Sequence, residues 1–140
     1  MDLDDLLGPK PIVVDLRSEN RWDAIDEIIN HLVVGQKINA ENREAIAKSV
    51  KHRESSMSTG IGFGIGFPHA STDLVPNVIA AVGRSQKGVQ FDALDGKPVH
   101  LVLLFLVPAG EFHKHLNTLA NIAKLLHRDD FRDGFWRRFL

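Results

Sequence analysis

Glycine at every second position of one segment is the feature that most limits how this chain can fold. The segment runs from Ser58 to Thr72 and reads STGIGFGIGFPHAST, with glycines at 60, 62, 64 and 66. Side chains of a strand alternate between two faces, so this spacing predicts one strand with bulky apolar groups on one face and bare backbone on the other. Glycine weakens a strand, so we expect another backbone or a ligand to approach this one closely.

Pro68 and His69 end the glycine run. Proline fixes φ and removes a backbone donor, which predicts a stop in strand pairing and a rigid corner that presents His69. A neutral imidazole is a good nucleophile near pH 7, because its pKa lies close by. The bare glycine backbone favours an anion site beside it. From position alone, a loop histidine satisfied by one hydrogen bond is an equally good interpretation.

Composition places the chain among ordinary globular domains. With 140 residues, 44% hydrophobic and 25% charged, we expect a single domain, residues 1–140. The net charge of −1 argues against nucleic-acid binding, and the absence of cysteine excludes disulfides and thiolate metal sites. The acidic start lacks the apolar core of a signal peptide, and the longest apolar run is too short to span a bilayer. We therefore expect a cytoplasmic protein without direct membrane insertion.

The remaining patterns predict strands alternating with helices. The expected strands are 12–16, 78–83, 89–91 and 99–107, with turns at Lys87-Gly88 and 95–98. The expected helices are a first one capped by Ser18 and ended by Gly35, and others at about 40–53 (after Asn39), 113–127 and 129–139. The run 99–107 is apolar on both faces, which is typical of a central strand covered on both sides. Together, these strands and helices predict a three-layer α/β domain, in which α-helices flank a mixed β-sheet.

Other glycine motifs do not account for the segment, and few further side chains are candidates for a site. The G-x-G-x-x-G spacing fails at every start, and neither a P-loop nor a Gly-x-Ser-x-Gly elbow occurs.

Arg53 could hold a phosphoryl group bidentately or could only complement a helix dipole. His113 and His115 follow the central strand, at an end where ligands collect. They point to nearly opposite sides of a helix, so at most one can share a site, and His115 is favoured because it adjoins the apolar stripe.

The segment 58–69 closely resembles the active-site segment of IIA domains of the bacterial phosphotransferase system, of the fructose, mannitol and nitrogen-regulatory type. The similarity continues through Arg53-Glu54, the run 95–99, His115-Leu116 and the run 129–132. It implies a mixed sheet of about five strands between helices. The sequence departs from the family pattern at two positions: Gly66 replaces the usual alanine, and Lys114 stands where an acidic residue is common.

The resemblance implies a phosphotransferase that carries phosphate on histidine. His69 would accept a phosphoryl group from an HPr-type phosphocarrier and pass it to a IIB domain or subunit for sugar uptake. His115 would be the second active-site histidine, and Arg53 would lie beside the site. The alternative is a nitrogen-regulatory IIA, a phosphorylation-dependent switch that binds regulatory target proteins and transports no sugar. No IIB, IIC or HPr segment is recognised within the 140 residues, which suits both roles.

The phosphoryl and partner contacts are expected around the imidazole. Phe63 or Phe67 would line a shallow apolar recess, while the backbone at Gly62 and Gly64 and the hydroxyl of Ser71 would contact the phosphoryl group. No cofactor and no metal is expected, because a phosphoramidate itself stores the transfer potential.

Two other classes of function stay open. One is a pure interaction module that has lost phosphate carriage, which stoichiometric phosphorylation would exclude. The other is a metalloenzyme that uses His69, His113 and His115, which metal analysis of the purified protein would test.

Overall fold

The most apolar stretch of the chain forms the central strand of the sheet. The computed structural model describes residues 11–139, apart from the side chains at 112, 115, 116, 118, 119 and 135. Strand β6 (Val99–Pro108) is buried over nearly its whole length and pairs antiparallel with β5 (Ile79–Val89). On the other side of β6, β3 (Ile65–Gly66) and β4 (His69–Thr72) lie end to end, both parallel to it. The central strand therefore supports the segment that carries the candidate site.

Two short strands complete the sheet at its edges. β1 (Ile12–Asp15) pairs parallel with β5, and β2 (Gly60–Gly62) pairs antiparallel with β3. In the described part of the chain the sheet has six strands, in the order β1-β5-β6-β3-β2 with β4 paired to β6 off this path. The predicted mixed sheet is confirmed, with six strands where about five were expected.

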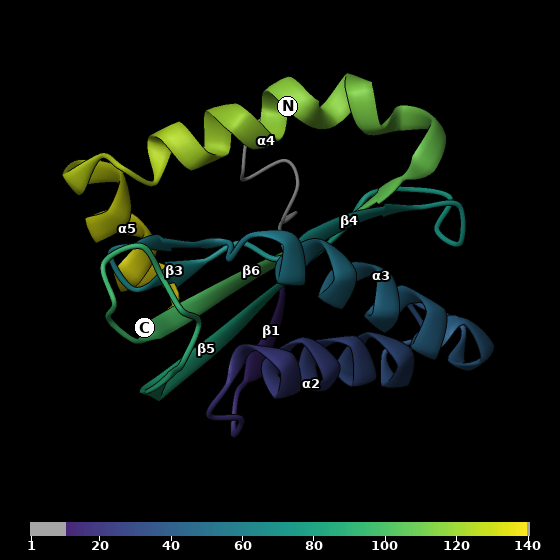
Figure 1. Cartoon of the computed structure of the whole chain (residues 1–140), viewed down its shortest axis with the longest axis horizontal. Coiled ribbons are helices and arrows are strands. Elements are labelled where there is room, and N and C mark those ends of the chain that lie inside the picture. Colours follow the sequence, from purple (N-terminus) through teal and green to yellow (C-terminus); the bar gives the residue numbers. More distant parts are fainter. Residues whose placement is uncertain (1–10, 140) are drawn as a thin grey trace.

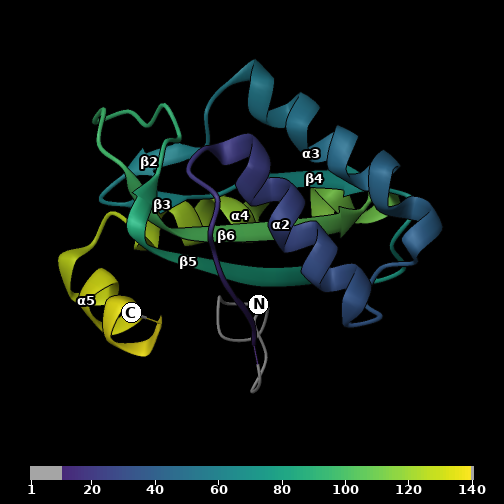
Figure 2. The ribbon, with the colours of Figure 1, turned by 90° about the horizontal axis from the view of Figure 1, so that it is seen from below.

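Helices cover both faces of the sheet, as the doubly apolar β6 predicts. Helices α2 (Arg21–Val34) and α3 (Arg43–Ser56) lie on one face, and α4 (Phe112–Leu125) lies on the other, followed by α5 (Asp129–Phe139) (Figures 1 and 2). Alternate residues of β6 enter separate cores. Val102, Leu104 and Leu106 pack with α2 and α3, whereas Leu101, Leu103, Phe105 and Val107 pack with the ends of α4 and α5.

Some predicted boundaries were wrong for local reasons. The first helix is capped by Asn20, whose side chain accepts a hydrogen bond from the Asp23 N–H, while the Ser18 hydroxyl donates to Glu27 at 2.6 Å. After Asn39 comes a 3-10 turn, Ala40–Asn42, before α3 begins. The expected turn at Lys87-Gly88 is an irregularity inside β5, where the register to β6 shifts between Arg84 and Val89. Gly88 has a φ of +99° there, a backbone conformation that glycine adopts easily and that this β-bulge requires.

The glycine segment is a hairpin, and the prediction of one alternating strand was wrong. The chain reverses between β2 and β3 through Phe63 and Gly64, whose φ angles are +60° and +79°. Two consecutive left-handed residues make the turn type that matches the twist of a tight hairpin. The guanidinium carbon of Arg132 lies 3.7 Å from the centroid of the Phe63 ring. The Phe63 and His127 rings form an edge-to-face contact with their centroids 5.5 Å apart. These contacts hold an aromatic residue in a backbone conformation that it rarely adopts.

The absence of a side chain at Gly60 of β2 lets the loop that follows β5 lie against this edge of the sheet. The Leu94 N–H donates to the Gly60 carbonyl at 3.0 Å. A Cβ added to Gly60 would lie 2.7 Å from the Ala93 Cβ and 2.8 Å from the Ala93 Cα. The predicted close approach of another backbone is therefore present at Gly60, and the approaching segment belongs to the same chain.

We predict that Gly60→Ala destabilises the fold by about 1–3 kcal/mol, because the new methyl group collides with main-chain atoms. Chemical denaturation monitored by circular dichroism measures this change. Gly110→Ala is the matched control, since nothing lies within 4 Å of its added Cβ, and it should shift stability by less than about 0.5 kcal/mol. Equal effects of the two substitutions would contradict the assigned contact.

Candidate functional site

His69 is the first residue of β4, on the sheet face that α4 covers. It pairs with Phe105 of β6, which belongs to the core on the α4 side, while the next residue, Ala70, belongs to the core under α2 and α3. The Pro68 carbonyl accepts a hydrogen bond from the Phe105 N–H at 3.1 Å. The predicted stop at Pro68 is therefore brief: pairing with β6 is interrupted after Gly66 and resumes at His69.

The imidazole of His69 is partly buried against an aromatic wall. Its ring centroid lies 5.6 Å from that of Phe67, which in turn lies 4.9 Å from that of Phe105. Burial lowers the pKa of His69 below its ordinary value, and the positive charge of Arg53 acts in the same direction. The hydrogen bond to the Phe67 carbonyl and the negative charge of Glu54 oppose this shift. The net lowering favours a neutral imidazole near pH 7, the form that has a free lone pair.

One hydrogen bond decides which ring nitrogen carries the proton. Nδ1 of His69 lies 2.9 Å from the carbonyl oxygen of Phe67. A carbonyl oxygen only accepts hydrogen bonds, so in the neutral ring Nδ1 is the donor. The lone pair is then on Nε2, which is the nitrogen available to a reacting group.

Arg53 comes to the site from the last turn of α3. Its side chain is exposed, and α3 lies against β4, so the guanidinium is close enough to act on the pKa of His69. The structure thus places the charge of Arg53 near enough to influence His69. Ser71, two residues further along β4, is exposed and shares the strand face of His69.

The other candidates from the sequence have different positions. The backbone of residue 115 lies in the first turn of α4, but the His115 side chain is outside the described part of the structure. His113 is exposed in the same turn. Phe63, Gly62 and Gly64 form the hairpin turn. Ile65, the first residue after this turn, pairs with Leu101, and His69 pairs with Phe105, so four strand residues, or about 13 Å along β6, separate Ile65 from His69.

The sequence did not reveal the group that anchors this segment. Glu54 is buried at 1% exposure. Its carboxylate accepts from the Thr59 N–H at 2.8 Å, from the Thr59 hydroxyl at 2.5 Å and from Arg21 at 3.2 Å. A glutamate near a helix end normally suggests a solvated residue. The only available signal was its position directly after Arg53 and ahead of the glycine run.

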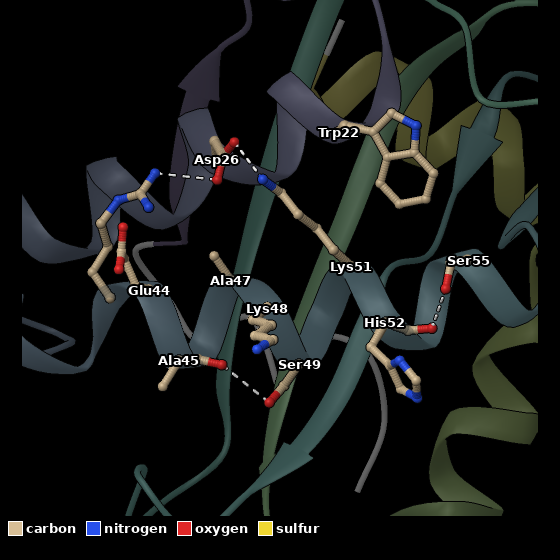
Figure 3. A pocket seen from close by; sticks show the side chains of 11 residues that line it. Trp22, Asp26, Glu44, Ala45, Ala47, Lys48, Ser49, Lys51, His52 and Ser55 are labelled. Atoms are coloured by element: carbon tan, nitrogen blue, oxygen red, sulfur yellow. Dashed lines mark hydrogen bonds and ion pairs between the residues drawn. The ribbon is translucent and has the colours of Figure 1, made fainter.

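A groove of about 950 Å³ between α2 and α3 lies apart from these residues (Figure 3). Its walls are mainly charged and hydroxyl side chains with the Trp22 ring at one end, and Asp26 in it is paired with both Arg43 and Lys51. Neither His69 nor Arg53 lines it. The candidate site therefore remains at the imidazole of His69, outside this groove.

Among the side chains that the structure describes, which do not include that of His115, no group of three or more His, Asp or Glu residues is arranged to hold a metal ion. The same described part of the chain contains no helix long and apolar enough to cross a membrane.

Comparisons with known proteins agree with this fold and segment. Over 132 residues the chain is 38% identical to the PTS system fructose-specific EIIABC component of Bacillus subtilis, spanning 94% of this chain and 20% of that protein. Over 131 residues it is 34% identical to the nitrogen regulatory protein of Pseudomonas aeruginosa, spanning 94% of this chain and 84% of that protein. The crystal structure of nitrogen regulatory protein IIA-Ntr from Neisseria meningitidis matches with a TM-score of 0.79 at 28% identity, covering 93% of this chain and 87% of that one.

These matches define the class of protein: a IIA domain of a phosphoryl-transfer system. Residues 5–137 match the family described as "Phosphoenolpyruvate-dependent sugar phosphotransferase system, EIIA 2", and the chain belongs to this family. Its relatives include both sugar-specific and nitrogen-regulatory proteins.

We predict that His69 makes the fold less stable in mild acid. Because the folded-state pKa of His69 lies below its ordinary value, the unfolded chain binds the proton more readily. The free energy of unfolding should therefore fall as the pH drops from about 7.5 through the usual imidazole range. Urea unfolding at a series of pH values should show a steeper fall for wild type than for His69→Gln, and equal slopes would refute the assignment.

Proposed function

We propose that the protein is a phosphocarrier that accepts a phosphoryl group on His69 from a phosphohistidine of an HPr-type protein and passes it on. The observation that carries this proposal is the hydrogen bond from Nδ1 of His69 to the Phe67 carbonyl, which leaves Nε2 unprotonated at a partly exposed position. Membership of the EIIA family supports the general reaction.

In the proposed transfer, the lone pair of Nε2 forms a bond to the phosphorus of the donor. The phosphorus–nitrogen bond of the donor breaks, and its electron pair remains on the donor imidazole. The Nδ1 proton stays in its hydrogen bond with Phe67, so the ring does not rotate during transfer. One such bond replaces another, which makes the step reversible, and catalysis rests on in-line placement and on stabilisation of charge.

Arg53 is proposed to stabilise the charge on the transferred group. A guanidinium presents paired donors that match phosphoryl oxygens, and this side chain is exposed in a position where its charge already acts on His69. We propose the Ser71 hydroxyl and His115 as further contacts, Ser71 from its place on the same strand face and His115 from the family resemblance. The Phe67 ring provides the apolar side of the recess.

The primary role that we propose is sugar uptake, with a IIB domain or subunit as acceptor. The 38% identity to a fructose-specific protein favours it. A nitrogen-regulatory role, in which phosphorylation changes binding to target proteins, is favoured by the match to IIA-Ntr over 93% of this chain. In a transfer assay, a carrier for sugar uptake passes its label to a fructose-type IIB, whereas a regulator retains it and changes its affinity for a target.

We predict that His69→Ala abolishes labelling by ³²P-phospho-HPr, since Nε2 of His69 is the proposed accepting nitrogen. Gel autoradiography under alkaline conditions preserves a phosphoramidate and measures the label. His52→Ala, one residue before Arg53 in the same helical turn, removes an exposed imidazole and should label like wild type. Acid-labile label that persists on a folded His69→Ala variant would overturn the proposal.

We predict that Arg53→Gln lowers the rate of labelling about 10²- to 10³-fold, the range seen when a charge-stabilising donor is removed. Rapid-quench kinetics at saturating phospho-HPr measure the rate. Arg53→Lys keeps the charge but loses the planar fork, and its rate should lie between wild type and Arg53→Gln. A wild-type rate in Arg53→Gln would remove Arg53 from the site.

A further inference from the structure

Hydrogen bonds connect the ion pair between the partly buried Arg21 and the buried Glu54 to the imidazole of His69. Arg21 in α2 donates to Glu54 at 3.2 Å, and the Glu54 carboxylate accepts the Thr59 hydroxyl at 2.5 Å. The Thr59 hydroxyl oxygen and the Thr59 carbonyl in turn accept the Phe67 N–H, at 3.3 Å and 3.1 Å. The Phe67 carbonyl then accepts Nδ1–H of His69 at 2.9 Å.

We propose that Glu54 is a positioning residue that acts through Thr59 and Phe67 to hold His69 in the tautomer that leaves Nε2 unprotonated. This inference rests on the proposed function for its kinetic consequence, but the tautomer itself is a property of the unmodified protein.

The backbone of Phe67 is anchored on both sides of its carbonyl. Its N–H is held by Thr59, and the next carbonyl along the chain, that of Pro68, is held by the Phe105 N–H. The Phe67 side chain is buried at 5% exposure. The carbonyl between these anchors therefore has a fixed direction, and the imidazole that donates to it has a fixed orientation.

Glu54 determines the anchor on the Thr59 side. An ionised carboxylate accepts every hydrogen bond offered to it and donates none, so it forces the Thr59 hydroxyl to donate to it. The hydroxyl oxygen then faces the Phe67 N–H as an acceptor. The Arg21 guanidinium offsets the cost of burying the charge, and it also donates to the Phe91 carbonyl at 3.3 Å.

The inference predicts a change of tautomer in variants that break this connection. In wild type, ¹⁵N NMR of the His69 side chain should show a protonated Nδ1 and an unprotonated Nε2 when the ring is neutral. In Thr59→Val, which removes the hydroxyl at nearly constant volume, and in Glu54→Gln, the opposite tautomer should gain population. The rate of labelling by phospho-HPr should fall about 10- to 100-fold, as for other residues that orient a reacting histidine.

Two controls separate positioning from a general loss of stability. Thr59→Ser retains the hydroxyl and should keep both the wild-type tautomer and a rate close to wild type. Glu27→Gln makes the same chemical change in a carboxylate that also accepts several hydrogen bonds, from Arg17 and Ser18 in the loop before α2. It should leave the His69 spectrum unchanged.

The inference would be overturned if folded Thr59→Val or Glu54→Gln kept the wild-type tautomer and labelling rate. It would also be overturned if Glu27→Gln changed the tautomer population of His69 by the same amount. If Glu54→Gln does not fold, the Thr59→Val and Thr59→Ser pair still decides it. The NMR measurement needs no phosphoryl donor. A wild-type protein that fails to accept label would therefore refute the proposed function, while the tautomer comparison would still test the role of Glu54.

Discussion

The local structure around the candidate site depends on one buried carboxylate. Glu54 lies in the last turn of α3, almost fully buried, and its carboxylate accepts three hydrogen bonds from Thr59 and Arg21. Removing Arg21 would leave this buried charge without its ionic partner, which is destabilising. The same contacts connect α2, α3 and the start of the glycine hairpin. A charge that the fold must satisfy thus fixes where the hairpin begins and where its second arm delivers His69.

The site combines two requirements that usually conflict. An imidazole that accepts a phosphoryl group from another protein needs to be reachable, yet it needs a neutral ring and one fixed tautomer. Partial burial against Phe67 lowers the pKa of His69, and a main-chain carbonyl settles the tautomer, so neither requirement needs a second charged side chain in contact with the ring. The charge of the Arg53 guanidinium also acts on this imidazole.

The sequence predicted the parts of the fold that local chemistry controls. β6 was evident because its residues are apolar on both faces, and α5 because its aromatic residues recur at helical spacing. The hairpin was not predicted, because alternating glycine and apolar residues look the same on both arms, and phenylalanine at 63 gives no sign of a turn. His69 and Arg53 could be proposed from the sequence. The role of Glu54 could not, since its burial depends on Arg21 and on the backbone near Phe91, both distant along the chain.

The loop that follows β5 affects the edge of the sheet at β2. β2 lies at the end of the strand order, where unpaired backbone can recruit a strand from another molecule. The Leu94 N–H occupies the Gly60 carbonyl and places the chain of residues 93 and 94 along this edge. The missing side chain at position 60 therefore lets the chain itself occupy part of this edge, where a strand of another molecule would otherwise pair.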